Sequence, residues 1–190
     1  MRQYADLAKN LPVVKPEQLW VADITYLTTR QNPIYLHLVT DAYSKRIMGY
    51  HLSDHLGAGA TAEALKMALR CRQYTGKLIH HSDRGLQYSS KEYTQLLKDH
   101  QIDISMTQTG SPYDNAIAER VNGILKQEFG LDYTLKTINQ AQSLTDQAIA
   151  LYNGLRPHMS NHFLTPDQMH AQDKLKPRKW HKKKLPAFEN

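Results

Sequence analysis

Apolar and polar residues in the first 53 positions follow the pattern of short β-strands. Residues 20–29, 34–43 and 46–53 are rich in β-branched and aromatic side chains, and short turn-like pieces such as RQNP and SK separate them. Consecutive strands that are joined by such short turns pair antiparallel. This part of the chain therefore predicts a three-stranded antiparallel meander.

Further along, the apolar spacing alternates between that of helices and that of strands. From Ala60 to Tyr74 apolar residues recur at helical spacing, which predicts an amphipathic helix with Thr61 as its N-cap and an end near Gly76. Residues 77–82 and 102–106 then predict buried strands, and residues 90–100 and 138–155 predict helices. A meander followed by βα units predicts an α/β fold with a five-stranded mixed sheet.

Length and composition limit how the chain is organised. With 190 residues and 41% hydrophobic content, it predicts one substantial core, which we place at residues 20–170 between an N-terminal extension (1–19) and a basic tail (171–190). No apolar run approaches the roughly 20 residues of a membrane span, and the single cysteine, Cys71, excludes an internal disulfide. We therefore expect a soluble protein of a reducing cytoplasm.

The net charge of +6 is concentrated at the C-terminal end. Residues 174–184 hold seven Lys or Arg and no acid, which leaves 17 basic against 18 acidic residues elsewhere. A basic segment of this kind either binds phosphates with release of counterions or serves only as a solvated end that aids solubility. We expect the segment to be mobile in the absence of DNA.

The stretch SPYDNAIAER, residues 111–120, predicts a helix start and contains two carboxylates with different roles. Ser111 suits the N-cap, Pro112 the first helical position and Asp114 the third, so Asp114 has a structural task. Glu119 lies on the helix face opposite the apolar stripe, where a glutamate is ordinarily only solvated. The same face carries Asn115, Asn122 and Lys126.

Two aspartates change the interpretation of Glu119. Asp23 lies inside an apolar strand pattern, where burying a carboxylate costs several kcal/mol unless it is paired, hydrogen-bonded or metal-bound. Asp83 directly follows a buried strand, at the end where α/β sheets place ligands, although an Asx-turn before Gly85 explains it equally well. Together with Glu119 they would form an oxygen-rich site that suits Mg²⁺ or Mn²⁺.

The motifs around these acids resemble one known family. They are W..DITYL around Asp23, HSDRGLQY around Asp83, SPYDNAIAER up to Glu119 and YNGLRPH at residues 152–158. Thirty-five residues separate Asp83 from Glu119, and Lys126 follows seven residues after Glu119. In this order and spacing, residues 15–170 resemble the catalytic region of bacterial insertion-sequence transposases of the retroviral-integrase type.

The resemblance implies a ribonuclease-H-like fold and DNA cleavage with strand transfer at transposon ends. It implies two cations, Mg²⁺ or Mn²⁺, with Asp23 bridging both, Asp83 binding one and Glu119 the other. Without metal, repulsion among the acids can move Glu119 away. Lys126 is expected to contact a DNA phosphate, while Asn115 and Asn122 are expected to touch DNA or to orient Glu119. The expected partners are transposon-end and target DNA and further copies of the chain on DNA, and no membrane.

Two alternatives remain open from the sequence. One is a metal-dependent nuclease of the same fold that does not join strands, and the other is a non-catalytic module for DNA binding or assembly. Transposases of this kind carry a helix-turn-helix region ahead of the catalytic core, whereas about nineteen residues precede Trp20. From this we expect an excised catalytic domain or the product of a truncated gene, with reduced or unselective cleavage.

Overall fold

The computed structural model describes residues 4–29, 32–108, 116–133 and 137–178. Its centre is a five-stranded sheet in the order β3-β2-β1-β4-β5. The strands are β1 (Leu19–Leu27), β2 (Ile34–Asp41), β3 (Ile47–Ser53), β4 (Ile79–Ser82) and β5 (Asp103–Met106). The first three strands pair antiparallel. β4 pairs parallel with β1, and β5 pairs parallel with β4. The predicted meander and mixed sheet are therefore confirmed.

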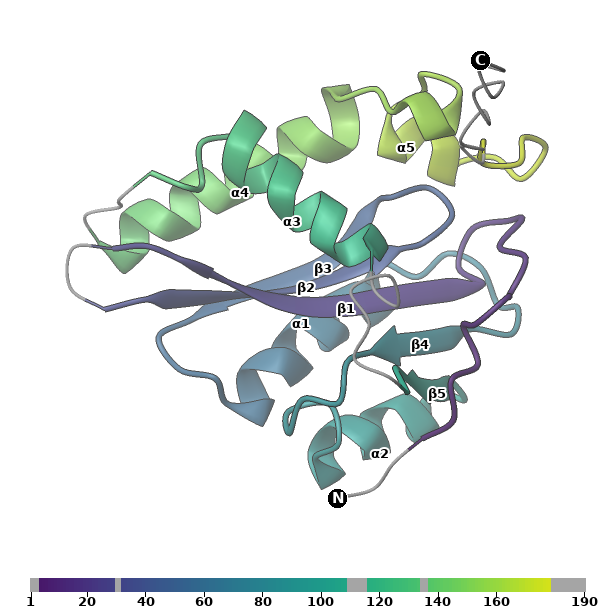
Figure 1. The fold of residues 1–190 in the computed structure, drawn as a ribbon, viewed down its shortest axis with the longest axis horizontal. Helices are drawn as coiled ribbons and strands as arrows, with labels where there is room; N and C mark the ends of the chain where they lie inside the picture. The colour runs from purple at the N-terminus through teal and green to yellow at the C-terminus, as the bar shows by residue number, and fades with distance from the viewer. Residues whose placement is uncertain (1–3, 30–31, 109–115, 134–136, 179–190) are drawn as a thin grey trace, which may run out of the picture.

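Helices cover both faces of this sheet (Figure 1). Below it in the view lie α1 (Ala58–Arg70) and α2 (Lys91–Asp99), and above it lie α3 (Ala116–Glu128), α4 (Ile138–Leu155) and the short α5 (Pro166–His170). One apolar cluster joins the meander to α3 and α4, and a second joins the sheet to α1 and α2. A 3₁₀ turn, η2 (Met159–Asn161), lies between α4 and α5.

The expected limits of α1 were wrong at both ends. Gly57 is its N-cap, and Thr61 lies inside the helix, where its hydroxyl is 3.0 Å from Nδ1 of His37. At the other end the helix stops at Arg70, short of the expected Gly76. The Glu17 carboxylate accepts the backbone N–H groups of Gln73 and Tyr74 at 2.9 and 3.0 Å, so a distant side chain satisfies them outside the helix.

The remaining helices agree better with the sequence pattern. α2 is capped by Ser90, whose side chain accepts the N–H of Tyr93, and α4 spans the expected residues with Thr137 as its cap. The start of α3 expected at Ser111, Pro112 and Asp114 falls outside the described residues. α5, which begins with a Thr165–Gln168 capping box, was not predicted.

Helix α1 packs against β3 without room for a side chain at Gly49. A Cβ atom at this position would lie 2.2 Å from the carbonyl oxygen of Ala64 and 2.5 Å from the nitrogen of Ala68. Both atoms belong to the backbone of α1, so no side-chain movement relieves the clash. Gly49 therefore sets the close approach of α1 to the sheet.

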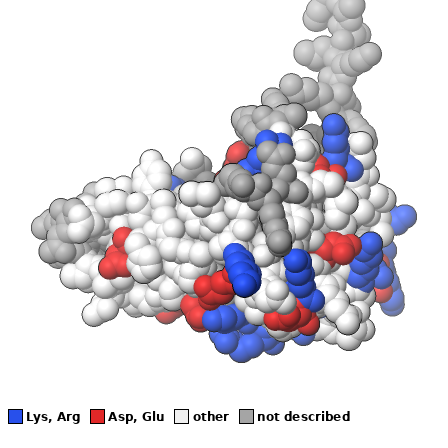
Figure 2. Space-filling view, turned by 90° about the horizontal axis from the view of Figure 1, so that it is seen from below, with Lys and Arg blue, Asp and Glu red and all other residues white. Residues whose placement is uncertain are grey.

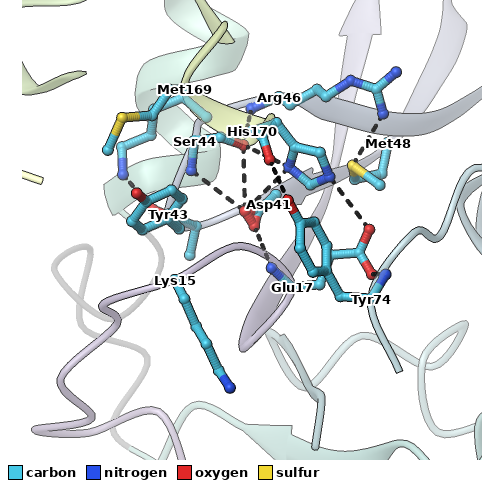
Figure 3. Close-up of polar contacts among 12 residues, drawn as sticks. Lys15, Glu17, Asp41, Tyr43, Ser44, Arg46, Met48, Tyr74, Met169 and His170 are labelled. Atoms are coloured by element: carbon cyan, nitrogen blue, oxygen red, sulfur yellow. Dashed lines mark hydrogen bonds and ion pairs between the residues drawn. The ribbon is translucent and has the colours of Figure 1, made fainter. Parts of the chain in front are cut away.

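A buried polar cluster joins the segment before β1 to α5 (Figure 3). Nε2 of His170 lies 3.2 Å from Oε1 of Glu17, and Nδ1 lies 3.1 Å from Oγ of Ser44 and 3.8 Å from Oδ2 of Asp41. Asp41 also accepts the backbone N–H of Glu17 at 3.0 Å. Burial raises the pKa of Asp41, whereas the hydrogen bond from His170 and two backbone N–H groups hold the pKa of Glu17 below its ordinary value. This cluster, Glu17–Asp41–His170, ties segments from both ends of the chain together.

The two outer segments pack on the domain where they are described. Leu7 donates its N–H to Oγ of Ser105 at 2.8 Å, so the residues before β1 lie against the β5 side of the sheet. At the other end Arg178 donates its N–H to the carbonyl of Ser160 at 2.8 Å. Leu175, Lys176 and Arg178 of the basic segment thus form hydrogen bonds with the core. Residues 179–184 lie outside the described part, and the mobility of the segment stays a prediction.

Charge on the body of the molecule is mixed, as the near balance of basic and acidic residues predicts. Figure 2 shows the face that lies below the sheet in Figure 1, and Lys and Arg side chains there are interspersed with Asp and Glu. No helix in the described part of the chain is long and apolar enough to cross a membrane.

Candidate active site

Asp23 and Asp83 come from neighbouring parallel strands. Asp23 lies in β1, the central strand, and Asp83 is the first residue after β4. The two strands pair from Leu19 with Ile79 to Val21 with His81. Two more residues in the same register bring Asp23 level with Asp83, so the topology places both acids at one point of the sheet.

Both aspartates line one cavity of about 250 Å³. Its other walls are formed by Ile24, Thr25, Tyr26, Tyr35, Leu56, Gln87 and Tyr88. Asp83 is exposed, and its Oδ1 accepts the N–H of Gly85 at 2.8 Å. This contact is the Asx-turn that the sequence left as an alternative, and it occupies one of the two oxygens of Asp83.

The carboxyl group of Asp23 accepts a hydrogen bond and lies near two other negative charges. Oδ2 accepts an N–H from Nδ2 of Asn122 on α3 at 2.7 Å. Burial, together with the negative charges of Asp83 and Glu119, raises the pKa of Asp23 to about 6 against the lowering effect of its hydrogen bonds. The charges of Asp83 and Glu119 therefore act on Asp23, the most buried of the three acids.

Glu119 reaches this group from α3. Its side chain is exposed in the first turn of the described helix, and α3 packs against β1. Within the described residues, however, no three His, Cys, Asp or Glu side chains are gathered closely enough to hold a metal ion. Glu119 contributes its charge at Asp23 but is not a wall of the cavity.

The other predicted residues of α3 differ in their surroundings. Lys126 places its Nζ 4.5 Å from the ring centroid of Tyr26, which is 61% exposed. Asn122 is buried at 7% exposure and donates to Asp23, so it does not lie on the open helix face where the sequence pattern placed it, and its expected contact with DNA or Glu119 stays a prediction. Asn115 lies outside the described residues. The role of Asn122 toward Asp23 was missed because no sequence signal links them.

The histidines before Asp83 are structural. His80 and His81 are both 1% exposed, with Nε2 of His80 2.8 Å from the hydroxyl of Tyr93 and Nδ1 of His81 2.8 Å from Oγ of Ser105. Burial lowers the pKa of His80 to about 3, so its ring is neutral at physiological pH. They position the end of β4 from which Asp83 follows.

The donor set of this site fits a hard divalent cation. Its groups are carboxylate oxygens, which Mg²⁺ and Mn²⁺ prefer, and their mutual repulsion would be relieved by positive charge. In addition, Oδ1 of Asn122 is buried and has no hydrogen-bond partner among the described residues. Asp23, Asp83 and Glu119 are the carboxylates that would hold such an ion.

Sequence comparisons identify the relatives of this chain. A family model described as an integrase core domain matches residues 13–112, and a second model with the same description matches residues 100–166. Transposase InsF for insertion sequence IS3fB of Escherichia coli K12 is 36% identical over 160 residues, which cover 83% of this chain and 55% of that protein. A putative transposase for insertion sequence element IS986/IS6110 of Mycobacterium tuberculosis H37Ra is 41% identical over 118 residues, 60% of this chain and 42% of that protein. The chain spans about half the length of the curated relatives it matches.

Solved structures show the same fold at lower identity. The integrase catalytic core domain of HTLV-2 in complex with magnesium has a TM-score of 0.65 and 21% identity, covering 83% of this chain and 98% of that one. A chain of the simian T-cell lymphotropic virus intasome has a TM-score of 0.71 and 21% identity, covering 96% and 63%. The sheet order with its flanking helices is thus the ribonuclease-H-like fold. By sequence and by fold, this chain belongs to the integrase core family of bacterial insertion-sequence transposases.

Proposed function

We propose that this chain is the catalytic domain of a transposase that cleaves DNA strands and transfers the resulting 3′-hydroxyl ends to target DNA. The observation that carries the proposal is the meeting of Asp23 and Asp83 on adjacent parallel strands, with Glu119 close enough to raise the pKa of Asp23. This is an acid set that suits phosphoryl transfer with divalent cations. The names of the relatives, which are transposases, favour transposition over plain hydrolysis.

Each acid has a distinct task in this proposal. Asp23 is the most buried of the three acids, and the charges of both Asp83 and Glu119 act on it. It would therefore contact two cations. Asp83 and Glu119 would each bind one. Two cations held there would supply activation of the attacking water or 3′-hydroxyl and stabilisation of the leaving oxygen. Asn122 orients Asp23, and Lys126 beside Tyr26 offers a positive charge to a DNA phosphate.

The proposal is tested with a labelled DNA that carries a pre-cut 3′-hydroxyl transposon end. With Mg²⁺ and target DNA, the wild type is expected to give longer, joined products, and Glu119→Gln is expected to give none at an unchanged melting temperature, because its side chain is exposed. Glu92→Gln changes another exposed helical glutamate, on the opposite face of the sheet, and serves as the matched control.

Other results would favour the alternatives. Metal-dependent shortening of the DNA without joined products would identify a nuclease of the same fold. Binding of DNA with neither product would identify a non-catalytic module. The assay also includes substrate at high concentration, so that weak binding of the DNA end does not hide the chemistry. Assembly of several copies on DNA is part of the proposal and is measured by the mass of the complex in solution.

A further inference from the structure

A cavity of about 360 Å³ lies on the other flank of α3, away from Asp23. Its walls come from α3, from Lys45 in the turn between β2 and β3, and from the segment 156–160 that follows α4. The apolar part of the lining consists of Ala116, Ile117, Val121, Ile124, Pro157 and Met159. None of the three acids lines it, so it is a separate site.

The polar lining of this cavity consists of three cationic side chains, one histidine and Ser160. Lys45, Arg120, Arg156 and His158 all face it. Arg156 is neutralised by Glu128, to which it donates two hydrogen bonds of 2.6 and 2.7 Å. Lys45 and Arg120 form no salt bridge with a carboxylate in the described part of the chain. The Lys45 ammonium donates to the backbone carbonyl of Ala42 and is near the charge of Asp41, and Arg120 is near the charge of Glu128. Two cationic side chains outside any salt bridge therefore lie beside one cavity.

These charges also act on their neighbours. Burial, together with the positive charges of Arg156, Lys45 and Arg120, lowers the pKa of His158 to about 4 against the opposing charge of Glu128. Burial lowers the pKa of Lys45 to about 8, with Asp41 opposing. Holding like charges together in a partly buried place costs free energy unless an anion neutralises them. The cavity thus favours an anionic ligand.

We propose that this cavity binds a phosphate group of the DNA backbone, with Arg120 and Lys45 as its charged ligands. The inference rests on the proposed function, which supplies DNA as the partner. Arg120 directly follows Glu119, and successive residues of a helix are turned by about 100°, so one rigid helix presents the acid on one flank and the guanidinium toward the other. A strand that reaches Glu119 needs to cross only α3 to place a neighbouring phosphate at the cavity. The planar guanidinium fork matches phosphate oxygens.

The test measures the salt dependence of DNA binding for the full chain in metal-free buffer, where no cleavage interferes. Fluorescence anisotropy of a labelled duplex gives the slope of log K against log salt for the wild type, Arg120→Gln, Lys45→Gln and the double variant. Each lost phosphate contact reduces the slope by about 0.9 for B-DNA. We expect a reduction of about 0.9 for each single variant and about 1.8 for the double variant, with weaker binding at every salt concentration.

A matched control separates a local contact from a general loss of charge. Arg70→Gln removes an exposed arginine from α1, on the opposite face of the sheet, and is expected to leave the slope unchanged. Melting temperatures show whether each variant is folded. Because Lys45 has a positive φ of 67° and could affect folding, Arg120→Gln, at an exposed position, keeps the test decisive. An unchanged slope in folded Arg120→Gln overturns the proposal, and so does an equal change in Arg70→Gln.

Inorganic phosphate, the second probe, distinguishes a DNA phosphate from a small free anion. Phosphate at constant ionic strength is followed by the NMR signal of the Arg120 side chain. A shift that a DNA duplex abolishes by competition supports the proposal, whereas a shift without any effect of Arg120→Gln on DNA binding overturns it in favour of a free anion. The strand-transfer assay with Glu119→Gln is independent: if the wild type joins no ends but the slope depends on Arg120, the proposed function fails and the phosphate site remains.

Discussion

The amide of Asn122 donates a hydrogen bond of 2.7 Å to Oδ2 of Asp23 and so links the helix of Glu119 to the central strand. Asn122→Ala removes this donor, and groups that orient a metal-binding carboxylate typically contribute 10–100-fold to metal affinity or activity. We expect Mg²⁺-dependent cleavage to fall by about that factor, because Asp23 loses its fixed orientation. Single-turnover cleavage assays and metal titration measure the loss.

A pH profile distinguishes this positioning role from a simple loss of packing. The hydrogen bond from Asn122 lowers the pKa of Asp23, so its removal is expected to move the pH midpoint of metal binding upward. Asn139→Ala changes an exposed asparagine of α4 and is expected to alter neither quantity. A loss of activity with an unmoved midpoint would contradict the positioning role.

Asp23→Asn is expected to stabilise the metal-free protein at neutral pH. The folded pKa of about 6 lies above the ordinary value of 3.8, so the folded state holds the proton more tightly and stability falls as pH rises between these values. Above pH 6 the ionised group destabilises the fold by a constant amount, at most about 3 kcal/mol for a shift of about two units. Urea unfolding at pH 7.5 should therefore show a gain of about 1–3 kcal/mol, and at pH 3.5 none.

With Mg²⁺ present, the wild type is expected to become more stable than Asp23→Asn. The ion binds the folded wild type and so stabilises it, while the variant, which has lost a charged ligand, gains little. A wild type whose melting temperature does not respond to Mg²⁺ at any concentration would argue against a metal site at Asp23.

Gly49→Ala is expected to destabilise the fold severely. The added methyl group would meet the backbone of α1 at 2.2 and 2.5 Å, so the helix has to move away from β3. We expect a loss of about 3 kcal/mol or more, at the upper end of what overpacking costs. The same substitution at Gly123 in α3, where nothing lies within 4 Å of the added carbon, is expected to stabilise by about 0.5–1 kcal/mol. Equal effects at the two positions would show that backbone freedom, and not the contact with α1, determines the cost at Gly49.

His170→Ala is expected to cost about 3–5 kcal/mol, because removing one partner of a buried polar pair leaves the other without compensation. In this protein both Glu17 and Asp41 would lose the imidazole that faces them. Chemical denaturation measures the loss, with His55→Ala as the control at an exposed histidine. A cost below about 1 kcal/mol would mean that water replaces the ring without penalty.

Much of the sheet could be predicted from local pattern. Alternation of strand-forming residues and short turns indicated the meander, and the rule that ligands gather at strand ends drew attention to Asp83. A carboxylate inside an apolar strand was reason enough to single out Asp23. These signals are local, or depend only on the order of the elements, and the structure brings the two aspartates to one cavity.

The parts that could not be predicted depend on distant contacts. Helix α1 ends early because Glu17, 56 residues before Gln73, accepts backbone N–H groups there. Asn122 is turned inward by Asp23, which is 99 residues away in sequence, although helical periodicity placed it on the open face with Glu119. The cation pair of the second cavity, Lys45 and Arg120, likewise comes together only in three dimensions.

The Glu17–Asp41–His170 cluster also has a consequence for the time course of synthesis. Glu17 and His170 are 153 residues apart, so at roughly 5–20 residues per second the ribosome takes on the order of 10–30 s to deliver the imidazole after the glutamate. During that interval both carboxylates are without the partner that allows their burial, and they remain hydrated. We therefore expect the segment before β1 to dock late, and a nascent chain halted before residue 170 is expected to leave the apolar cluster of Leu19 and Ala42 accessible to chaperones.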